Sequence, residues 1–396
     1  MKKRVGILTS GGDCPGLNAT IRGVAKALYA RMGDNVEIVG IANGYSGLIN
    51  GDYREMNEDD FRGILTLGGT ILGTKRTPFK LMRVVEDDNI DKVAAMKKTY
   101  KAAKLDCLLC LGGNGTHKTA NLLSQEGLNI IGLPKTIDND IYGTDVTFGF
   151  HTAVDIATDV IDRIHTTAGS HSRVMCIEIM GNKAGWLTLY SGIAGGADII
   201  LLPERPFDEN VFLEKVAQLE KARHNVIIAA SEGVKNKDGV FLCDLVSTAG
   251  QLDAFGHKAI LSGTSRYLAD LIHVRLGCKT RAIEFSTLQR CASHLASRTD
   301  ITEAYQVGGA SVEAAYRGET GKMCAIRRIS DMPYRTETEM VDVQKVANLE
   351  KRVPDDWISP DGMHVTEAFH HYARPLIQAE LTPIYIDGVP RHLHLH

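Results

Sequence analysis

Two carboxylates lie two residues apart in the segment Pro134-Lys-Thr-Ile-Asp-Asn-Asp140, as Asp138 and Asp140. The apolar residues 130–133 precede this segment and predict a buried strand. In open α/β sheets, ligands bind outside the carboxyl ends of the strands, so acids placed there can meet a substrate. One carboxylate could take a proton from a hydroxyl group while the other helps to hold Mg²⁺. The same residue types also form ordinary turns in which Asx side chains bond their own backbone.

A glycine-rich segment lies near the N-terminus, where the apolar residues 5–8 are followed by Thr9-Ser-Gly-Gly-Asp-Cys-Pro-Gly-Leu-Asn18. The periodicity of residues 19–28 predicts a helix after this loop. Glycine lets the backbone approach a ligand closely, and the first N–H groups of a helix favour an anion such as phosphate. The segment is neither a P-loop nor a G-x-G-x-x-G fingerprint, and an ordinary β-α turn is the alternative interpretation.

A second segment of this kind, residues 105–120, runs from an apolar stretch into Gly112-Gly-Asn-Gly-Thr116, whose threonine could cap a helix. Two phosphate-compatible loops and an acidic turn indicate one polyphosphate site. Arg173 and Lys183 flank a further apolar stretch, residues 174–179. Cations there suit a second phosphate, although Lys and Arg beside a strand are also typical of solvated strand ends.

Taken together, these motifs resemble those of the phosphofructokinase family in their order and spacing. The matching segments are residues 9–18, 112–116, 134–140 and 170–173, Met180-Gly181 with Ala184-Gly185, and Gln289-Arg290. The resemblance covers roughly residues 3–330. The acidic turn combined with the first glycine loop is far more specific than either glycine pattern alone. Members of the family transfer a phosphoryl group to the 1-hydroxyl of fructose 6-phosphate, from ATP or, in some branches, from inorganic pyrophosphate.

The resemblance implies roles for the residues of the acidic turn. Asp138 would be the general base that accepts the proton of the sugar hydroxyl. Thr136 would touch the substrate or the transferring phosphoryl group, and Lys135 would offset charge on the phosphates. Asp140 matches the acid placed near the metal, and Asn114 is the other candidate metal ligand. The implied cofactor is Mg²⁺.

The resemblance also implies two sets of binding residues. The phosphoryl donor would be bound by Gly12, Arg76, Gly112, Gly113, Gly115 and Thr116. Fructose 6-phosphate would be bound by Thr136, Asp138, Asp140, Arg173, Met180, Gly181, Glu232, Arg281 and Arg290. Several arginines suit a dianionic ligand, because a guanidinium can donate two parallel hydrogen bonds to phosphate oxygens. In the family, some arginines reach the sugar phosphate of a neighbouring subunit, and Arg173 and Arg281 match those positions. A homo-oligomer, either a dimer or a tetramer, is therefore expected.

Three positions depart from the family pattern. Asn114 replaces an acidic metal contact found in many members, Asn182 replaces an arginine, and Thr287 replaces a histidine of the bacterial short form. Lys183 could restore part of the missing positive charge.

Two positions bear on the phosphoryl donor and favour different answers. In the family, a glycine at the position of Gly115 leaves room for the α-phosphate of a nucleotide, whereas a lysine at the position of Lys135 is typical of pyrophosphate users. Because steric exclusion is stronger than one added attraction, the sequence favours ATP, with pyrophosphate as the alternative.

Apolar runs and helical periodicities alternate along the chain, which predicts parallel sheets with right-handed crossovers. Further expected elements are a strand at residues 35–42, a helix at about 147–164, the stretch 184–192, a helix at 210–223 and a strand at 226–230. The expected fold is α/β, with two phosphofructokinase-like lobes of mostly parallel sheet flanked by helices. The expected units are a donor-binding lobe of residues 1–150, completed by about residues 265–330, a sugar-phosphate-binding lobe of residues 151–264, and a C-terminal extension of residues 331–396 packed on the first lobe.

The composition agrees with an enzyme of the cytoplasm. The net charge of −3 gives no footprint for nucleic acid or an anionic membrane, so neither partner is expected. No apolar run approaches the roughly 18 residues of a membrane helix. The eight cysteines are scattered, and Cys107 and Cys110 would face opposite ways in a strand, so reduced thiols are expected.

Two functions of other classes remain as alternatives. A regulatory subunit that binds sugar phosphate without turnover is suggested by the three departures from the family pattern. A different nucleotide-dependent kinase with a Gly-Gly-x-Gly loop, acting on NAD or a lipid, would not explain the acidic turn or Gln289-Arg290.

Overall fold

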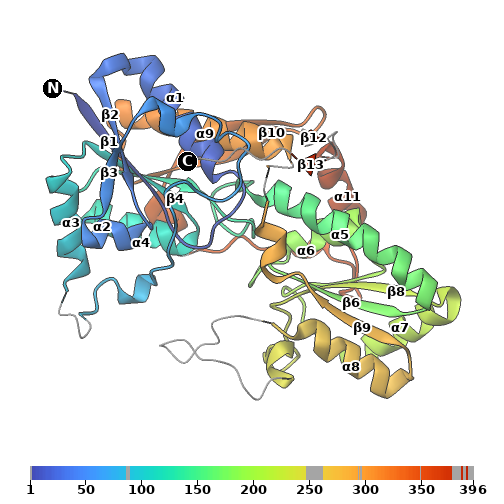
Figure 1. The fold of residues 1–396 in the computed structure, drawn as a ribbon. Coiled ribbons are helices and arrows are strands. Elements are labelled where there is room, and N and C mark those ends of the chain that lie inside the picture. Colours follow the sequence, from blue (N-terminus) through green and yellow to red (C-terminus); the bar gives the residue numbers. More distant parts are fainter. Residues whose placement is uncertain are drawn as a thin grey trace.

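The structure, a computed structural model, describes residues 2–85, 90–246, 262–292, 294, 297–347 and 349–376, and the backbone of residues 385–386 and 389–390. These residues form two α/β lobes (Figure 1). The first contains a seven-stranded sheet in the order β11-β10-β5-β4-β1-β2-β3, and the second a four-stranded sheet in the order β7-β8-β6-β9. The expected fold class is confirmed.

The first sheet has a parallel centre and antiparallel edges. Its parallel strands are β1 (Lys3–Thr9), β2 (Val36–Ile41), β4 (Cys107–Gly112), β5 (Ile130–Pro134) and β10 (Lys322–Ser330). Its edge strands are β3 (Tyr53–Met56) and β11 (Arg335–Asp342). The central strands read as continuous apolar runs because both of their faces are buried.

Helices from both ends of the chain belong to the first lobe. They are α1 (Leu17–Met32), α2 (Tyr45–Asn50), α3 (Lys92–Ala102), α4 (Asn114–Gln125), α9 (Arg298–Tyr316) and α10 (Val343–Val346). Helix α9 lies close to α1 at Gly308. A Cβ atom placed on Gly308 would lie only 2.5 Å from the carbonyl oxygen of Thr20. The glycine thus allows a backbone approach that any side chain would prevent.

The second sheet is parallel throughout. Its strands are β6 (Val174–Ile179), β7 (Ile199–Leu201), β8 (Val226–Ser231) and β9 (Thr280–Glu284), and its helices are α5 (Phe150–His171), α6 (Trp186–Ala194), α7 (Glu209–Arg223) and α8 (Thr264–Leu276). One hydrophobic cluster contains Ile7 of β1 and Ile177 of β6, so the apolar core runs through both lobes.

The remaining short elements connect these layers. They are the 3₁₀ helices η1 (Gly33–Asn35), η2 (Glu58–Phe61), η3 (Phe79–Leu81), η4 (Leu242–Leu245), η5 (Ser286–Arg290), η6 (Asp355–Trp357) and η7 (Arg374–Leu376), the helix α11 (Glu367–Ala373), and the strands β12 (Tyr385–Ile386) and β13 (Val389–Pro390). Among the described residues, no helix combines the length and the apolar character needed to cross a membrane.

Two local predictions have different outcomes. Cys107 and Cys110 belong to separate hydrophobic clusters, as expected for residues on opposite faces of a strand. The prediction that Thr116 caps a helix is wrong. Helix α4 begins at Asn114 with Gly113 at its N-cap, and Thr116 lies buried in the first turn.

The C-terminal extension contacts both lobes. Strand β11 belongs to the first sheet, whereas Phe369 of α11 packs edge-on against Tyr190 of α6, with ring centroids 4.9 Å apart. Trp357 packs in the same way against Trp186 of α6, at 5.9 Å. The extension was expected on the first lobe, and its described part also covers α6 of the second lobe. Residues 348, 377–384, 387–388 and 391–396 of the extension lie outside the described residues.

Candidate active site

The acidic turn begins at the carboxyl end of β5, where the amide of Lys135 donates a hydrogen bond to the carbonyl of Gly112 at 3.1 Å. Asn139, between the two carboxylates, has a left-handed backbone with φ of 53°. Its Oδ1 accepts a hydrogen bond from the amide of Thr147 at 3.0 Å. Asp138 differs, because its buried Oδ1 has no hydrogen-bond partner among the described residues. Oδ1 of Asp138 is therefore not used in an Asx turn.

Lys135 connects the acidic turn to the first glycine loop. Its side chain is buried, and its Nζ donates a hydrogen bond to the carbonyl oxygen of Gly12. A Cβ atom placed on Gly11 would lie 3.7 Å from the same Nζ. The two segments, which are far apart in the sequence, thus meet at one place.

Two arginines also approach this loop. Arg76 follows Thr74, whose hydroxyl donates to the carbonyl of Gly11 at 2.7 Å. The Nε of Arg290, in η5, lies 3.3 Å from Asp13 Oδ1. Its Nη1 would be only 2.9 Å from a Cβ atom on Gly12, so this glycine makes room for the guanidinium.

The charges of Lys135, Arg76 and Arg290 affect the pKa of Asp138. Burial raises the pKa of Asp138, while Lys135, Arg76 and Arg290 act to lower it. Burial lowers the pKa of Lys135, and Asp138 is among the groups that oppose this shift. A buried carboxylate with a free oxygen and several nearby cations can accept a proton in a site that also binds anions.

The second glycine loop presents the N-terminus of α4. A Cβ on Gly113 would lie 3.6 Å from the carbonyl of Lys135, whereas a Cβ on Gly115 would meet no atom within 4 Å. Gly112 packs against Thr116, and the Thr116 hydroxyl donates a weak bond to the carbonyl of Ser10 at 3.5 Å. Because the first amides of a helix have no partner within it, Gly115 and Thr116 offer backbone N–H groups suited to phosphate.

Asn114 and Asp140 form the part of the site that suits a metal. Asn114 Nδ2 donates to Asp140 Oδ2 at 2.9 Å, and the buried Oδ1 of Asn114 has no partner among the described residues. Burial, with Asp138 next in importance, raises the pKa of Asp140 to about 7. Amide and carboxylate oxygens fit Mg²⁺, which usually takes one or two carboxylates together with substrate phosphates. The described residues contain no group of three His, Cys, Asp or Glu side chains that could hold a metal alone.

Three of the predicted substrate-binding residues follow strands of the second lobe. Met180 and Gly181 follow β6, and Glu232 follows β8. Glu232 Oε1 accepts a hydrogen bond from the amide of Asn182 at 3.1 Å. Burial and then Asp138 raise the pKa of Glu232 to about 8. Glu232 and Asp138 are therefore near enough for the charge of one to affect the other.

Arg173 and Arg281 lie elsewhere within the chain. Arg173 precedes β6, and Arg281 is paired with Met175 in the first half of β9. Met180 is at the opposite end of β6, about 20 Å from Arg173 at the usual rise of a parallel strand. The structure therefore does not bring these two arginines together with the rest of the predicted site in a single chain.

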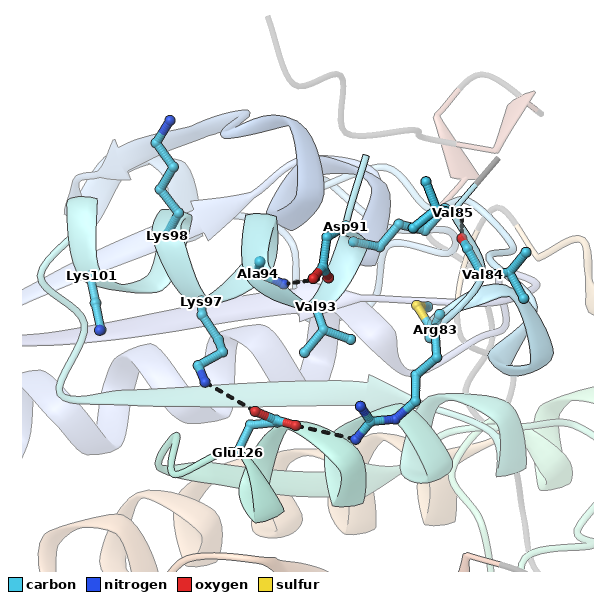
Figure 2. A pocket seen from close by; sticks show the side chains of 12 residues that line it. Arg83, Val84, Val85, Asp91, Val93, Ala94, Lys97, Lys98, Lys101 and Glu126 are labelled. Atoms are coloured by element: carbon cyan, nitrogen blue, oxygen red, sulfur yellow. Dashed lines mark hydrogen bonds and ion pairs between the residues drawn. The ribbon is translucent and has the colours of Figure 1, made fainter. Parts of the chain in front are cut away.

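A pocket of about 570 Å³ between α3 and α4 contains none of the predicted site residues (Figure 2). Two of its cations, Arg83 and Lys97, are paired with Glu126 at 3.2 and 3.0 Å. This pocket is a separate feature of the first lobe.

Sequence reasoning missed Lys351, which belongs to the extension. Its Nζ donates to Asn139 Oδ1 at 2.9 Å, directly behind the acidic turn. Burial lowers the pKa of Lys351 to about 7, although Asp145 and Asp140 oppose the shift. No local motif marks this lysine, because its partners lie more than 200 positions earlier in the chain.

A free carboxylate held among cations beside phosphate-compatible loops is the arrangement of an enzyme that transfers a phosphoryl group to an alcohol. The chain belongs to the phosphofructokinase family, whose sequence profile matches residues 4–315. It is 48% identical, over 89% of its length and 93% of the relative's, to a protein of Spirochaeta thermophila named ATP-dependent 6-phosphofructokinase. It is 42% identical, over 82% of its length and 90% of the relative's, to a pyrophosphate–fructose 6-phosphate 1-phosphotransferase of Amycolatopsis methanolica.

A similar solved structure is the pyrophosphate-dependent phosphofructokinase of Nitrosospira multiformis. It has a TM-score of 0.84 and 28% identity, and the match covers 99% of this chain and 96% of that one.

Proposed function

We propose that this chain is an ATP-dependent 6-phosphofructokinase, which transfers the terminal phosphoryl group of ATP to the 1-hydroxyl of fructose 6-phosphate and yields fructose 1,6-bisphosphate for glycolysis. The observation that carries the proposal is the environment of Asp138, whose unpartnered oxygen lies under the influence of Lys135, Arg76 and Arg290. The relatives named ATP-dependent 6-phosphofructokinase, at 48% and 42% identity, support it.

Asp138 acts as the general base and takes the proton of the sugar hydroxyl while the new O–P bond forms. Lys135 and Arg76 offset negative charge on the donor phosphates, together with the first amides of α4. Thr136 touches the transferring group or the sugar. Asn114 and Asp140 would hold Mg²⁺, which when bound neutralises part of the charge on the donor phosphates.

The two lobes divide the substrates between them. The first lobe binds the donor through the glycine loops at Gly12, Gly112, Gly113 and Gly115 and through Thr116. The second lobe and η5 bind fructose 6-phosphate through Met180, Gly181, Glu232 and Arg290, opposite Asp138 and Asp140. Arg173 and Arg281 bind the sugar phosphate of a neighbouring subunit, which is consistent with their distance from the other residues of one chain. The enzyme is accordingly a homo-oligomer, and its eight free cysteines agree with a location in the cytoplasm.

The donor is assigned from Gly115, because the space beside its α-carbon is open and can admit a nucleotide. The buried Lys135 favours pyrophosphate as the second candidate, and the Amycolatopsis relative carries that name. Initial rates with fructose 6-phosphate at matched ATP and pyrophosphate concentrations test the assignment. ATP is expected to give the higher rate. Activity with pyrophosphate alone would contradict the donor, and no turnover with either would indicate a regulatory subunit that only binds the sugar phosphate.

A further inference from the structure

Residues 350–353 of the C-terminal extension lie between the acidic turn and the second lobe, and we call this segment the strap. Glu350 forms an antiparallel β-bridge with Ile141. The amide of Lys351 donates a hydrogen bond to the carbonyl of Asp140 at 2.8 Å. The strap therefore extends the backbone pairing of the segment that carries the two carboxylates.

The ammonium group of Lys351 makes three hydrogen bonds to residues 139–145, in and just after the acidic turn. It donates to Asn139 Oδ1 at 2.9 Å, to the carbonyl of Asp145 at 2.8 Å and to the carbonyl of Thr144 at 3.2 Å. An ammonium group has three N–H donors, and these three acceptors match them in number. A neutral side chain of the same length cannot satisfy all three: Asn139 Oδ1 would keep its bond from Thr147, but the carbonyls of Thr144 and Asp145 would lose the donor from Lys351.

The same segment contacts the second lobe. The carbonyl of Lys351 accepts a hydrogen bond from Trp186 Nε1 at 3.0 Å, and its Nζ lies 5.0 Å from the centre of a Trp186 ring. Glu204 Oε1 accepts from the amides of Gly185 and Val353, at 2.9 and 3.1 Å. Gly185 and Trp186 end the loop that begins with Met180, so the strap touches both sides of the candidate site.

Asn139 connects Lys351 to the two carboxylates that are proposed to act in phosphoryl transfer. It stands between Asp138 and Asp140 in the left-handed conformation, which asparagine adopts more readily than most non-glycine residues and which bonds to its side chain stabilise. Its Oδ1 accepts from Thr147 on one side and from Lys351 on the other. Loss of the lysine would loosen the residue to which both carboxylates are joined.

We propose that Lys351 is a positioning residue for phosphoryl transfer, and that the strap holds the acidic turn in a fixed relation to the Met180 loop. The part that concerns catalysis rests on the proposed function. The part that concerns the conformation of the turn does not, because it can be measured without a substrate.

The test compares Lys351→Met with Lys322→Met, which removes the ammonium of a partly exposed lysine paired with Asp342. In Lys351→Met, kcat is expected to fall by about 100-fold, the loss typical of a misplacement near 1 Å. The KM for fructose 6-phosphate is expected to stay within about threefold, because Glu232 and Arg290, two of its proposed binding groups, are held by Asn182 and Asp13. Lys322→Met is expected to keep the kinetic constants of the unmodified chain.

Hydrogen exchange of the unliganded protein supplies the second measurement. Amides in residues 136–148 are expected to exchange about tenfold faster in Lys351→Met, while those of α7 keep their rates. Trp186→Phe keeps an aromatic ring but removes the donor to the Lys351 carbonyl and part of the ring that packs on Trp357, so it is expected to give the same changes, each about threefold. It serves as the second variant if Lys351→Met does not fold.

The outcomes separate the two proposals. An unmodified chain that is inactive with both donors overturns the proposed function, and the exchange rates still decide whether the strap holds the turn. Unchanged exchange in residues 136–148, or equally faster exchange in α7, overturns the strap proposal. A kcat within twofold of the unmodified value in Lys351→Met overturns the positioning role.

Discussion

Asn114 Nδ2 donates a hydrogen bond to Asp140 Oδ2 at 2.9 Å, and this bond joins the first residue of α4 to the acidic turn. The other amide atom, Oδ1, is buried and has no partner among the described residues. A hydrogen bond between side chains thus joins the second glycine loop to Asp140, the proposed metal ligand. The pair sets the geometry in which a cation would be received.

Replacement of Asn114 by aspartate is expected to lower the Mg²⁺ concentration needed for half-maximal rate by about fivefold. The change replaces a neutral ligand by an anionic one. It also places a second carboxylate beside Asp140, and a bound cation would reduce the repulsion between the two negative charges. The measurement is the initial rate against free Mg²⁺ at fixed fructose 6-phosphate and donor. Asn210→Asp, in the exposed first turn of α7, is the matched control. An unchanged requirement in Asn114→Asp would remove Asn114 from the metal site.

Asp138→Asn is expected to cut kcat by about 10³-fold while the affinity for fructose 6-phosphate stays nearly intact. The amide has the shape of the carboxylate but cannot accept the proton, and Asp138 Oδ1 makes no bond that the substitution would break. Turnover is followed in a coupled assay and affinity by calorimetry. Asp238→Asn, in an exposed loop, controls for the change of charge. Near-normal turnover would exclude Asp138 as the base.

Lys135→Met is expected to reduce the rate with pyrophosphate at least tenfold more than the rate with ATP, because pyrophosphate has no nucleoside to supply other contacts. Methionine keeps most of the buried aliphatic chain and loses the donor to Gly12. The ratio of kcat/KM for the two donors is compared before and after the substitution. If kcat/KM falls by the same factor with both donors, Lys135 positions the first glycine loop through its bond to Gly12 and does not select the donor.

Glu303→Gln tests a pH dependence of stability outside the site. Glu303 accepts hydrogen bonds from Tyr334 and Thr336, and burial raises its pKa from 4.5 to about 8. Between these values the folded chain keeps a proton that the unfolded chain releases. This contribution to stability is complete below pH 4.5 and is lost as the pH rises through about 8.

The unmodified chain is therefore expected to lose stability relative to Glu303→Gln as the pH rises from 5 to 8, by about 1 kcal/mol per pH unit. Denaturant unfolding at four pH values in this range measures the difference. Glu313→Gln, on the solvent side of the same helix, is the control and is expected to follow the unmodified chain. Parallel profiles for Glu303→Gln and the unmodified chain would refute the prediction.

The proposed role of Arg173 across a subunit boundary predicts complementation. Arg173→Ala and Asp138→Asn should each be nearly inactive at low fructose 6-phosphate, for different reasons. In oligomers formed by co-expression of the two variants, a site with an intact Asp138 can receive Arg173 from its neighbour, so a part of the activity should return. If oligomers shown to contain both variants recover no activity, Arg173 acts in the active site of its own subunit and not in that of its neighbour.

Local patterns in the sequence predict most of what the site is built from. Residues 174–179 form the predicted strand, because a short run rich in β-branched residues, Val174, Ile177 and Ile179, favours a buried strand over a helix. The start of the acidic turn is predicted as well, because the apolar run of β5 ends at Pro134 and polar residues begin at Lys135. The sequence predicts Thr116 as the N-cap of α4, but the N-cap is Gly113, because glycine can occupy this position without a side-chain signal.

The contacts of the extension could not be predicted in this way. Lys351 reaches Asn139 across 212 positions, and nothing in the residues around either one indicates the other. The packing of Trp357 on Trp186 is of the same kind, because aromatic residues at this spacing predict burial but not the partner.

The position of β10 beside β5 has a consequence for synthesis of the chain. The amide of Ile130 donates to the hydroxyl of Thr320, and these residues are 190 positions apart. While the chain emerges from the ribosome, the whole second lobe must appear before β10 can complete the first sheet. Until then β5 presents an open, apolar strand edge, the kind of surface that chaperones shield and that pairs wrongly between nascent chains.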